Sequence, residues 1–457
     1  MGIFKKNGLY KWVLLLAAPI ALQNIITYSV GLSDNLMVGS LGELALSGVY
    51  VANQLQNLLQ MLVIGLGAAI TILSSQYWGK RDTDSIKNIV GIALKFSVTA
   101  GIIFFIATLL FPIQILRLFT NNQAVIDSGF KYLKIIRFTY IFFCITQVLI
   151  ASMRSVERVK IGMNISIVTF FVNISLNWIL IFGHLGMPAL GIQGAAIATL
   201  TARILETIIM IYYVRKIDDR LKLKFQDLYH SDFVLLKDFL KYGLPVIMGD
   251  IFWGINLSVQ GAIVGRLGEK ALASVSISNI VFSIMGVAVY GTAGATSVII
   301  GKTVGTGDYV KVKQFAKELQ LLFIIIGVIS GIALFVVKDY ILLFYNLSDD
   351  TIIMAKQFLT VLSITIIGTA YQMSSLTGIV RAGGSIYFVL INDLIFVWLI
   401  VIPSAYLAAF VFHASPVVVF ACLKCDQILK CGVAVVKVNR FKWMKNLTRQ
   451  NSKAVQV

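Results

Sequence analysis

The chain has 457 residues, of which 58% are hydrophobic and only 13% are charged. A soluble domain carries about 25% charged residues, so this composition excludes a soluble enzyme. The formal net charge is +18. Because Lys and Arg flank apolar runs, we attribute this charge to membrane topology and to contact with anionic lipid headgroups, and not to nucleic-acid binding.

In chain order, the sequence has six apolar runs, a polar stretch and six further apolar runs. The first six lie at residues 12–38, 49–73, 89–111, 135–153, 161–182 and 191–214. The second six lie at residues 242–264, 275–300, 315–337, 353–379, 387–412 and 417–436. We therefore predict an all-α polytopic membrane protein of about twelve transmembrane helices, because each span needs roughly 20 apolar residues.

These runs predict two lobes. Residues 1–214 form the predicted amino-terminal six-helix lobe, residues 215–241 a cytoplasmic linker, and residues 242–457 the carboxyl-terminal six-helix lobe with a short basic cytoplasmic tail. Lys and Arg gather in the linker, in the tail and in every second loop, which predicts that both termini are cytoplasmic. The loop between the third and fourth runs also carries basic residues, and we expect an amphipathic helix at the interface there.

The two halves repeat each other at an offset of 226 residues, the separation of Pro19 and Pro245. The other matches are Gly39-Ser-Leu-Gly-Glu-x-Ala-Leu with Gly265-Arg-Leu-Gly-Glu-x-Ala-Leu, Asn53 with Asn279, Gly79 with Gly305 and Asp82 with Asp308. Six helices separate the copies, so we expect two pseudo-symmetric bundles around a central cleft. That arrangement is typical of an alternating-access transporter. The sequence has three His and no P-loop, which disfavours a membrane enzyme and ATP-driven transport.

Charged and amide side chains within the apolar runs are the candidate functional residues. Asp34 is the foremost, because it is the only charge between Lys11 and Glu43; the alternative is an ordinary residue at the water interface. Asn173 and Asn177 share one face of the fifth helix, and Thr199 lies on the sixth. Together these four side chains offer oxygen ligands to a hard cation such as Na⁺. The amides alternatively make interhelical hydrogen bonds.

Six further residues are candidates for the substrate cleft, and two of them are acids that either bind a cationic substrate or pair internally. They are Asp250, Asp393, Tyr28, Trp253, Tyr290 and Tyr371. We expect Arg203 and Glu206 to form an internal ion pair near the cytoplasmic end of the sixth helix. Four glycines suit close helix packing; they are Gly65, Gly67, Gly291 and Gly294.

At these residues the sequence closely resembles the multidrug and toxic compound extrusion (MATE) family. The resemblance rests on Pro19, on Asp34-Asn-Leu-Met-Val-Gly-Ser-Leu-Gly-Glu-Leu-Ala-Leu with its second-half copy, on Asn173-Ile-Ser-Leu-Asn-Trp-Ile-Leu-Ile-Phe-Gly, on Gly191-Ile-Gln-Gly-Ala-Ala-Ile-Ala-Thr, and on Trp443-Met-Lys-Asn-Leu-Thr. It implies a two-lobed exporter that exchanges Na⁺ or H⁺ for organic compounds. It also implies a cation site at Asp34, Asn173, Asn177 and Thr199. One branch of the family has an acid where Asn177 stands, and other members have acids on the tenth helix that this chain lacks.

We therefore expect a secondary active exporter that couples Na⁺ or H⁺ entry to the export of organic cations or amphipathic drugs. It would be a monomeric, multi-pass protein of the plasma membrane, with no enzymatic activity and no cofactor besides the coupling ion. A flippase for a lipid-linked saccharide is the main alternative, although such a protein usually needs a strongly basic central cavity. A receptor or scaffold that transports no solute is the third hypothesis, and the duplicated bundles disfavour it.

Overall fold

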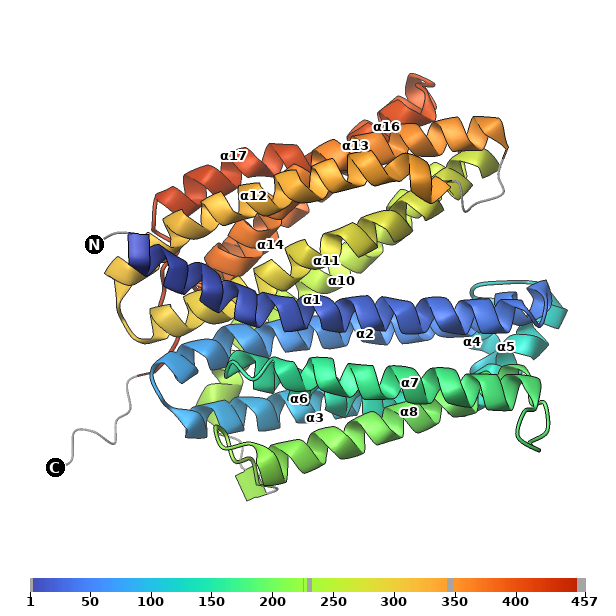
Figure 1. Cartoon of the computed structure of the whole chain (residues 1–457), viewed down its shortest axis with the longest axis horizontal. Helices are drawn as coiled ribbons and strands as arrows, with labels where there is room; N and C mark the ends of the chain where they lie inside the picture. The colour runs from blue at the N-terminus through green and yellow to red at the C-terminus, as the bar shows by residue number, and fades with distance from the viewer. Residues whose placement is uncertain (1–2, 225, 228–231, 343–347, 450–457) are drawn as a thin grey trace. The chain divides into compact units, whose positions relative to one another are not determined.

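The computed structural model describes residues 3–224, 226–227, 232–342 and 348–449. Within these ranges every regular element is a helix (Figure 1). Ten helices are long and apolar enough to cross a membrane, and a bent pair makes an eleventh candidate. The predicted all-α polytopic fold is confirmed.

The helices of the first half run from α1 to α8 and end in a short π-helical turn. Their bounds are α1 Ile3–Gly39, α2 Glu43–Gly79, α3 Thr83–Leu110, α4 Pro112–Arg117, α5 Gln123–Ile136, α6 Thr139–Ser155, α7 Lys160–Phe182, α8 Ile192–Tyr212 and η1 Tyr213–Ile217. Pro19 lies inside α1. The helix α5 has a buried apolar face and exposes Lys131 and Lys134, which matches the amphipathic helix expected between the third and fourth runs.

The second half begins with α10, which contains Pro245 as α1 contains Pro19. Its bounds are α10 Phe233–Gly265, α11 Glu269–Gly305, α12 Tyr309–Leu342, α13 Asp349–Met373, η2 Ser374–Arg381, α14 Ile386–Leu394, η3 Ile395–Val401, α15 Ile402–Tyr406, η4 Leu407–Val411, α16 Pro416–Lys424 and α17 Asp426–Asn439. The twelfth predicted run is divided between α16 and α17. Three charged residues interrupt it, namely Lys424, Asp426 and Lys430.

Contacts divide the chain into two compact units. The amino-terminal unit comprises Leu22–Ser74 and Thr83–Asp250, and the carboxyl-terminal unit comprises Met1–Ala21, Ser75–Asp82 and Ile251–Val457. In the first, α3 packs on α6, and α8 packs on α5, α6 and α7. In the second, α13 is central and contacts α11, α12 and α17 (Figure 1).

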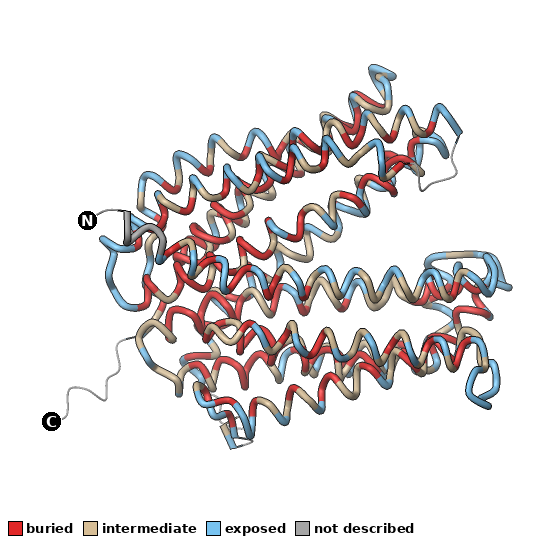
Figure 2. The backbone as a smooth tube through the Cα atoms, viewed as in Figure 1, coloured by how far each residue is buried: buried red, intermediate tan, exposed pale blue. Residues whose placement is uncertain are grey.

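Burial follows these contacts, with buried positions on the helix faces that meet and exposed positions on the outer faces (Figure 2). In the carboxyl-terminal unit, Phe358 of α13 stacks on Phe420 of α16 with ring centroids 4.4 Å apart. Many outward-facing side chains are large and apolar, such as Leu399 at 70% exposure. Such a surface suits a lipid environment, where helices must satisfy their own backbone hydrogen bonds.

Glycines mark equivalent contacts in the two units. A methyl group at Gly65 of α2 would approach the Ile247 Cα of α10 to 2.7 Å, and one at Gly291 of α11 would approach the Ala21 Cβ of α1 to 3.0 Å. Both pairs are related by the 226-residue offset. The predicted role of these two glycines in close helix packing is therefore confirmed, and the repeat in the sequence is also a repeat in three-dimensional contacts.

A second glycine pair lies where the ends of α2 and α11 cross within the carboxyl-terminal unit. A methyl group at Gly79 would overlap the Lys302 carbonyl, and one at Gly305 would overlap the Gln76 carbonyl. Since 76 + 226 = 302 and 79 + 226 = 305, each contact is the copy of the other. This reciprocity is the mark of a two-fold related contact, so the ends of α2 and α11 cross pseudo-symmetrically within this unit.

The predicted ion pair between Arg203 and Glu206 forms, with nitrogen and oxygen 2.8 Å apart. Its expected position near the cytoplasmic end is wrong, because both residues lie near the middle of the apolar span Ile192–Ile217. Glu206 is buried with 4% of its surface exposed. The partner explains how an acid persists at that depth, since an unpaired charge there would be costly.

Candidate cation site and intramembrane charges

Four polar side chains of the amino-terminal unit form a hydrogen-bonded chain across α1, α7 and α8. The Asn177 amide nitrogen donates to the Asp34 carboxylate at 2.5 Å and to the Asn173 carbonyl at 3.2 Å. The Asn173 amide in turn donates to the Thr199 hydroxyl at 3.5 Å. The four residues named from sequence as a cation site are thus neighbours, because the four-residue spacing of the two amides turns both toward one face of α7.

The Asn177 side chain leaves an acceptor without a donor. Asn177 is fully buried, and its carbonyl oxygen Oδ1 has no hydrogen-bond partner in the described part of the chain. Buried polar atoms are normally satisfied, and an orphan at a candidate site indicates an ion, a water or a moving proton. No Lys or Arg forms an ion pair with Asp34 among the described residues, since Arg203 is paired with Glu206. The cluster thus combines one carboxylate with neutral oxygens.

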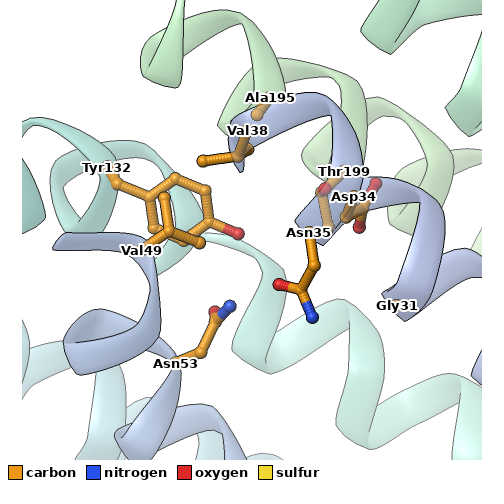
Figure 3. Close-up of a pocket in the computed structure, with 9 residues that line it drawn as sticks. All are labelled: Gly31, Asp34, Asn35, Val38, Val49, Asn53, Tyr132, Ala195 and Thr199. Carbon is orange, nitrogen blue, oxygen red and sulfur yellow. The ribbon is translucent and has the colours of Figure 1, made fainter. Parts of the chain in front are cut away.

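A pocket of about 120 Å³ opens beside Asp34 (Figure 3). Its lining includes Asn35 next to Asp34 on α1, Asn53 on α2 and Tyr132 on α5. Figure 3 shows their polar ends turned toward the same space. Ligand pockets for drug-sized molecules measure about 300–1,000 Å³, so this volume fits a hydrated ion better than a drug.

Three of these lining residues were not among the site residues named from sequence. Tyr132 was missed because α5 appeared only as an interfacial helix in a basic loop. Asn53 had a usable signal, since it matches Asn279 in the repeat. Asn35 adjoins Asp34, but consecutive residues of a helix point in different directions, so the sequence gave no reason to expect both in the lining of one pocket.

The six cleft candidates fall in different environments. Tyr28 and Asp250 belong to the amino-terminal unit, and Trp253, Tyr290, Tyr371 and Asp393 belong to the carboxyl-terminal unit. Tyr28 and Trp253 are each more than 40% exposed. Tyr371 is buried instead, and its hydroxyl donates to Gln320 at 2.7 Å. The Asp250 carboxylate faces Gly65 of α2, at 3.4 Å from the position a Cβ would take there.

Asp393 pairs internally, one of the two alternatives given for it from the sequence, and the two other residues of its charge cluster, Lys430 and Asp426, were not named there. The Lys430 ammonium lies 2.9 Å from the Asp393 carboxylate and 3.1 Å from that of Asp426. Both Lys430 and Asp426 are nearly fully buried. The signal was the four-residue spacing of Asp426 and Lys430 inside an apolar run, which puts an acid and a base on one helix face.

Family comparison identifies the repeat. A model of the MatE family matches residues 19–179 and 245–407 of this chain. The two matched segments begin 226 residues apart, at the two prolines that set the offset of the repeat. The chain is 26% identical over 410 residues to the probable multidrug resistance protein YoeA of Bacillus subtilis, with 88% of this chain and 87% of the relative covered.

Other relatives and structures agree along the whole length. The probable multidrug resistance protein NorM of Thermotoga maritima is 25% identical over 455 residues, covering 97% of this chain and 95% of the relative. The MATE transporter VcmN of Vibrio cholerae matches with a TM-score of 0.87 at 17% identity, covering 97% and 99% of the two chains. An outward-facing MATE family transporter matches with a TM-score of 0.85 at 18% identity, covering 94% and 96%. This chain belongs to the MATE family of non-enzymatic, multi-pass membrane transporters.

Proposed function

We propose that the protein exports organic, mainly cationic, drugs by antiport against Na⁺ or H⁺. The observation that supports the coupling is the Asp34 cluster, in which, among the residues that the structure describes, a carboxylate without an ion-pair partner adjoins the unpartnered Asn177 carbonyl. Export of drugs is supported by the similarity to YoeA and NorM, which are probable multidrug resistance proteins. The protein would act as a monomer in the plasma membrane, with both termini in the cytoplasm.

In this proposal the coupling cation binds at Asp34, Asn173, Asn177 and Thr199. The Asn177 amide now donates to Asp34. Rotation of that amide by half a turn would turn its carbonyl oxygen toward Asp34. That oxygen could then bind a Na⁺ ion together with the carboxylate, or accept a hydrogen bond from a protonated Asp34. A cation that favours one orientation of these helices drives transport only if it binds one global state more tightly than the other.

Alternating access would follow from the two predicted lobes, residues 1–214 and 242–457, joined by the linker 215–241. The pocket beside Asp34 is small for a drug, so the drug would bind outside it. Tyr28, Trp253 and Tyr290 offer aromatic faces, and Asp250 and Asp393 offer charges for an organic cation. Occupation of the ion site would then alter drug affinity through the helices and not by direct contact.

Efflux of ethidium from proteoliposomes tests this proposal, with the Na⁺ and proton gradients collapsed in separate experiments. The proposal predicts that efflux stops when one of the gradients is removed, which names the coupling ion. Efflux that persists without either gradient would contradict antiport. A well-folded protein that moves no dye but moves a lipid-linked saccharide would instead establish the flippase.

A further inference from the structure

The carboxyl-terminal unit contains a line of polar side chains that joins α13, α17 and α14. Gln427 of α17 accepts hydrogen bonds from Thr369 at 3.1 Å and from Gln372 at 2.9 Å, both on α13. Its amide nitrogen donates to both oxygens of Asp426, at 3.0 and 3.1 Å. From Asp426 the line continues through Lys430 to Asp393, which lies on α14 within the apolar span Ile386–Val411.

The two acids that contact the Lys430 ammonium differ in environment. The Asp426 side chain is 4% exposed, and an ammonium and an amide together satisfy its oxygens. The Asp393 side chain is 45% exposed and has Lys430 as its polar partner. A half-exposed carboxylate within a membrane span cannot face lipid without a cost of several kcal/mol, so its open side faces water or a ligand.

The charges in contact do not balance. Two carboxylates share one ammonium, which leaves one negative charge in the triad. A fourth charge, Lys424, lies two residues before Asp426 and interacts with it electrostatically. Its ammonium contacts the Gln260 carbonyl at 3.5 Å and lies outside ion-pair distance of both carboxylates. One monovalent cation on the open side of Asp393 would therefore neutralise the group of three.

We propose that the open side of Asp393 binds the ammonium group of an organic cation, with Lys430 as a built-in competitor for that carboxylate. When the ligand arrives, Lys430 keeps its contact with Asp426, one helical turn away on α17, so that no buried charge is left without a partner. When the ligand leaves, Lys430 again neutralises Asp393. This inference rests on the proposed drug export, and it assigns the cationic end of the substrate to one carboxylate.

An aromatic ring beside the charge cluster favours an organic ammonium group over a small ion as the occupant. The Phe396 ring, with its centroid 5.9 Å from the Lys430 ammonium, adds an aromatic surface near the site. Aromatic faces attract quaternary and alkyl ammonium groups.

Labelling of the wild-type protein tests the site without any substitution. An apolar carbodiimide modifies open carboxyl groups through their protonated form, so the reaction is run at mildly acidic pH, where a fraction of each exposed carboxyl group is protonated. Peptide mass spectrometry then quantifies modification at each acid. We expect labelling of Asp393, reduced several-fold by saturating ethidium. Asp339 is the matched control, since it is 53% exposed and 3.0 Å from Lys356 near the end of α12. Absence of labelling at Asp393 when Asp339 is labelled, or labelling of Asp393 that ethidium leaves unchanged, would overturn the proposal.

Dye binding to purified variants supplies the second test. Asp393→Asn should weaken ethidium binding about tenfold, the scale of one lost ion contact, and Asp339→Asn should leave binding unchanged. Lys430→Gln should tighten ethidium binding, because the competing ammonium is gone, and Lys430→Arg should restore wild-type affinity. If Lys430→Gln does not fold, the double variant Asp393→Asn/Lys430→Gln removes one charge of each sign, and it should bind ethidium as weakly as Asp393→Asn.

The outcomes separate this inference from the proposed function. Wild-type protein that binds and exports ethidium, with unchanged affinity in Asp393→Asn, would overturn the assignment to Asp393 and leave drug export intact. Wild-type protein that neither binds nor exports any organic cation would overturn the cationic substrate class together with the site.

Discussion

The candidate sites of the two units differ in how their acids are partnered. In the amino-terminal unit, Asp34 has an amide donor and no ion-pair partner among the described residues. In the carboxyl-terminal unit, Asp393 and Asp426 share the Lys430 ammonium. One unit therefore leaves Asp34 open to a mobile cation. The other provides Asp393 and Asp426 with the ammonium group of its own Lys430.

This difference shows that a repeated fold need not repeat its chemistry. The helix contacts at Gly65 and Gly291 are copies of one another, because backbone packing depends on small residues at fixed offsets. The charged residues of the two candidate sites are not copies, since residue 260, which matches Asp34 at the 226-residue offset, is Gln. After such a duplication, one half can specialise for coupling while the other binds a different ligand.

The largest effect is expected at Asp34. Asp34→Asn keeps the shape of the side chain but removes the charge that a coupling cation needs, so gradient-driven ethidium efflux should fall at least tenfold. Protein yield and thermal stability should be unchanged or higher, because burial of a charge without an ion-pair partner is costly. Efflux assays on cells with matched expression measure this. Asp127→Asn, at an exposed acid of α5, is the control. An equal loss of ethidium efflux in both variants would contradict a specific role for Asp34.

Removal of Lys430 should have the next largest effect, this time on stability. Lys430→Met leaves two carboxylates near one another without a cation, and loss of one partner of a buried pair costs about 3–5 kcal/mol. Thermal unfolding in detergent should show a strongly lowered midpoint. Asp393→Asn in the same chain should recover part of the loss. A Lys430→Met protein as stable as wild type would mean that the cluster is not held by charge.

The glycine crossing tests the symmetry that underlies the comparison. Gly79→Ala and Gly305→Ala should each destabilise the protein by about 1–3 kcal/mol, the usual cost of overpacking. The two losses should be similar, since each methyl group meets the same kind of backbone carbonyl. Gly261→Ala is the control, because a Cβ at Gly261 has no neighbour within 4 Å. A clear loss at Gly79 with none at Gly305 would contradict the two-fold relation.

The smallest effect is expected at a surface ion pair outside both clusters. The Arg158 guanidinium hydrogen-bonds Asp219 and lowers the pKa of that carboxyl below its usual value. A lowered pKa in the folded state contributes stability above the ordinary pKa of about 4, and the contribution disappears as the pH falls through the folded-state pKa. Asp219 is exposed, so Asp219→Asn should leave efflux and the neutral-pH unfolding midpoint nearly unchanged. A large shift would show that surface charges matter as much as the buried clusters.

Much of the fold followed from apolar runs and from the 226-residue repeat, because membrane helices have a strong composition signal. The Asp34 cluster was also predictable, since Asn173 and Asn177 share a helix face with a lone acid nearby. Tyr132 was not, because its position depends on how α5 packs on α8. The Lys430 cluster was overlooked because an apolar run was treated as uniform, although its i, i+4 charges were in the sequence.

If the Asp34 cluster binds the coupling cation, a gradient of drug should drive movement of that ion across the membrane. Proteoliposomes loaded with ethidium, with no initial ion gradient, would be monitored for Na⁺ or proton movement opposite to the dye. We expect one of these ions to move opposite to the dye in the wild type, and neither ion to do so in Asp34→Asn. Equal ion movement in both proteins would contradict the assignment of coupling to Asp34.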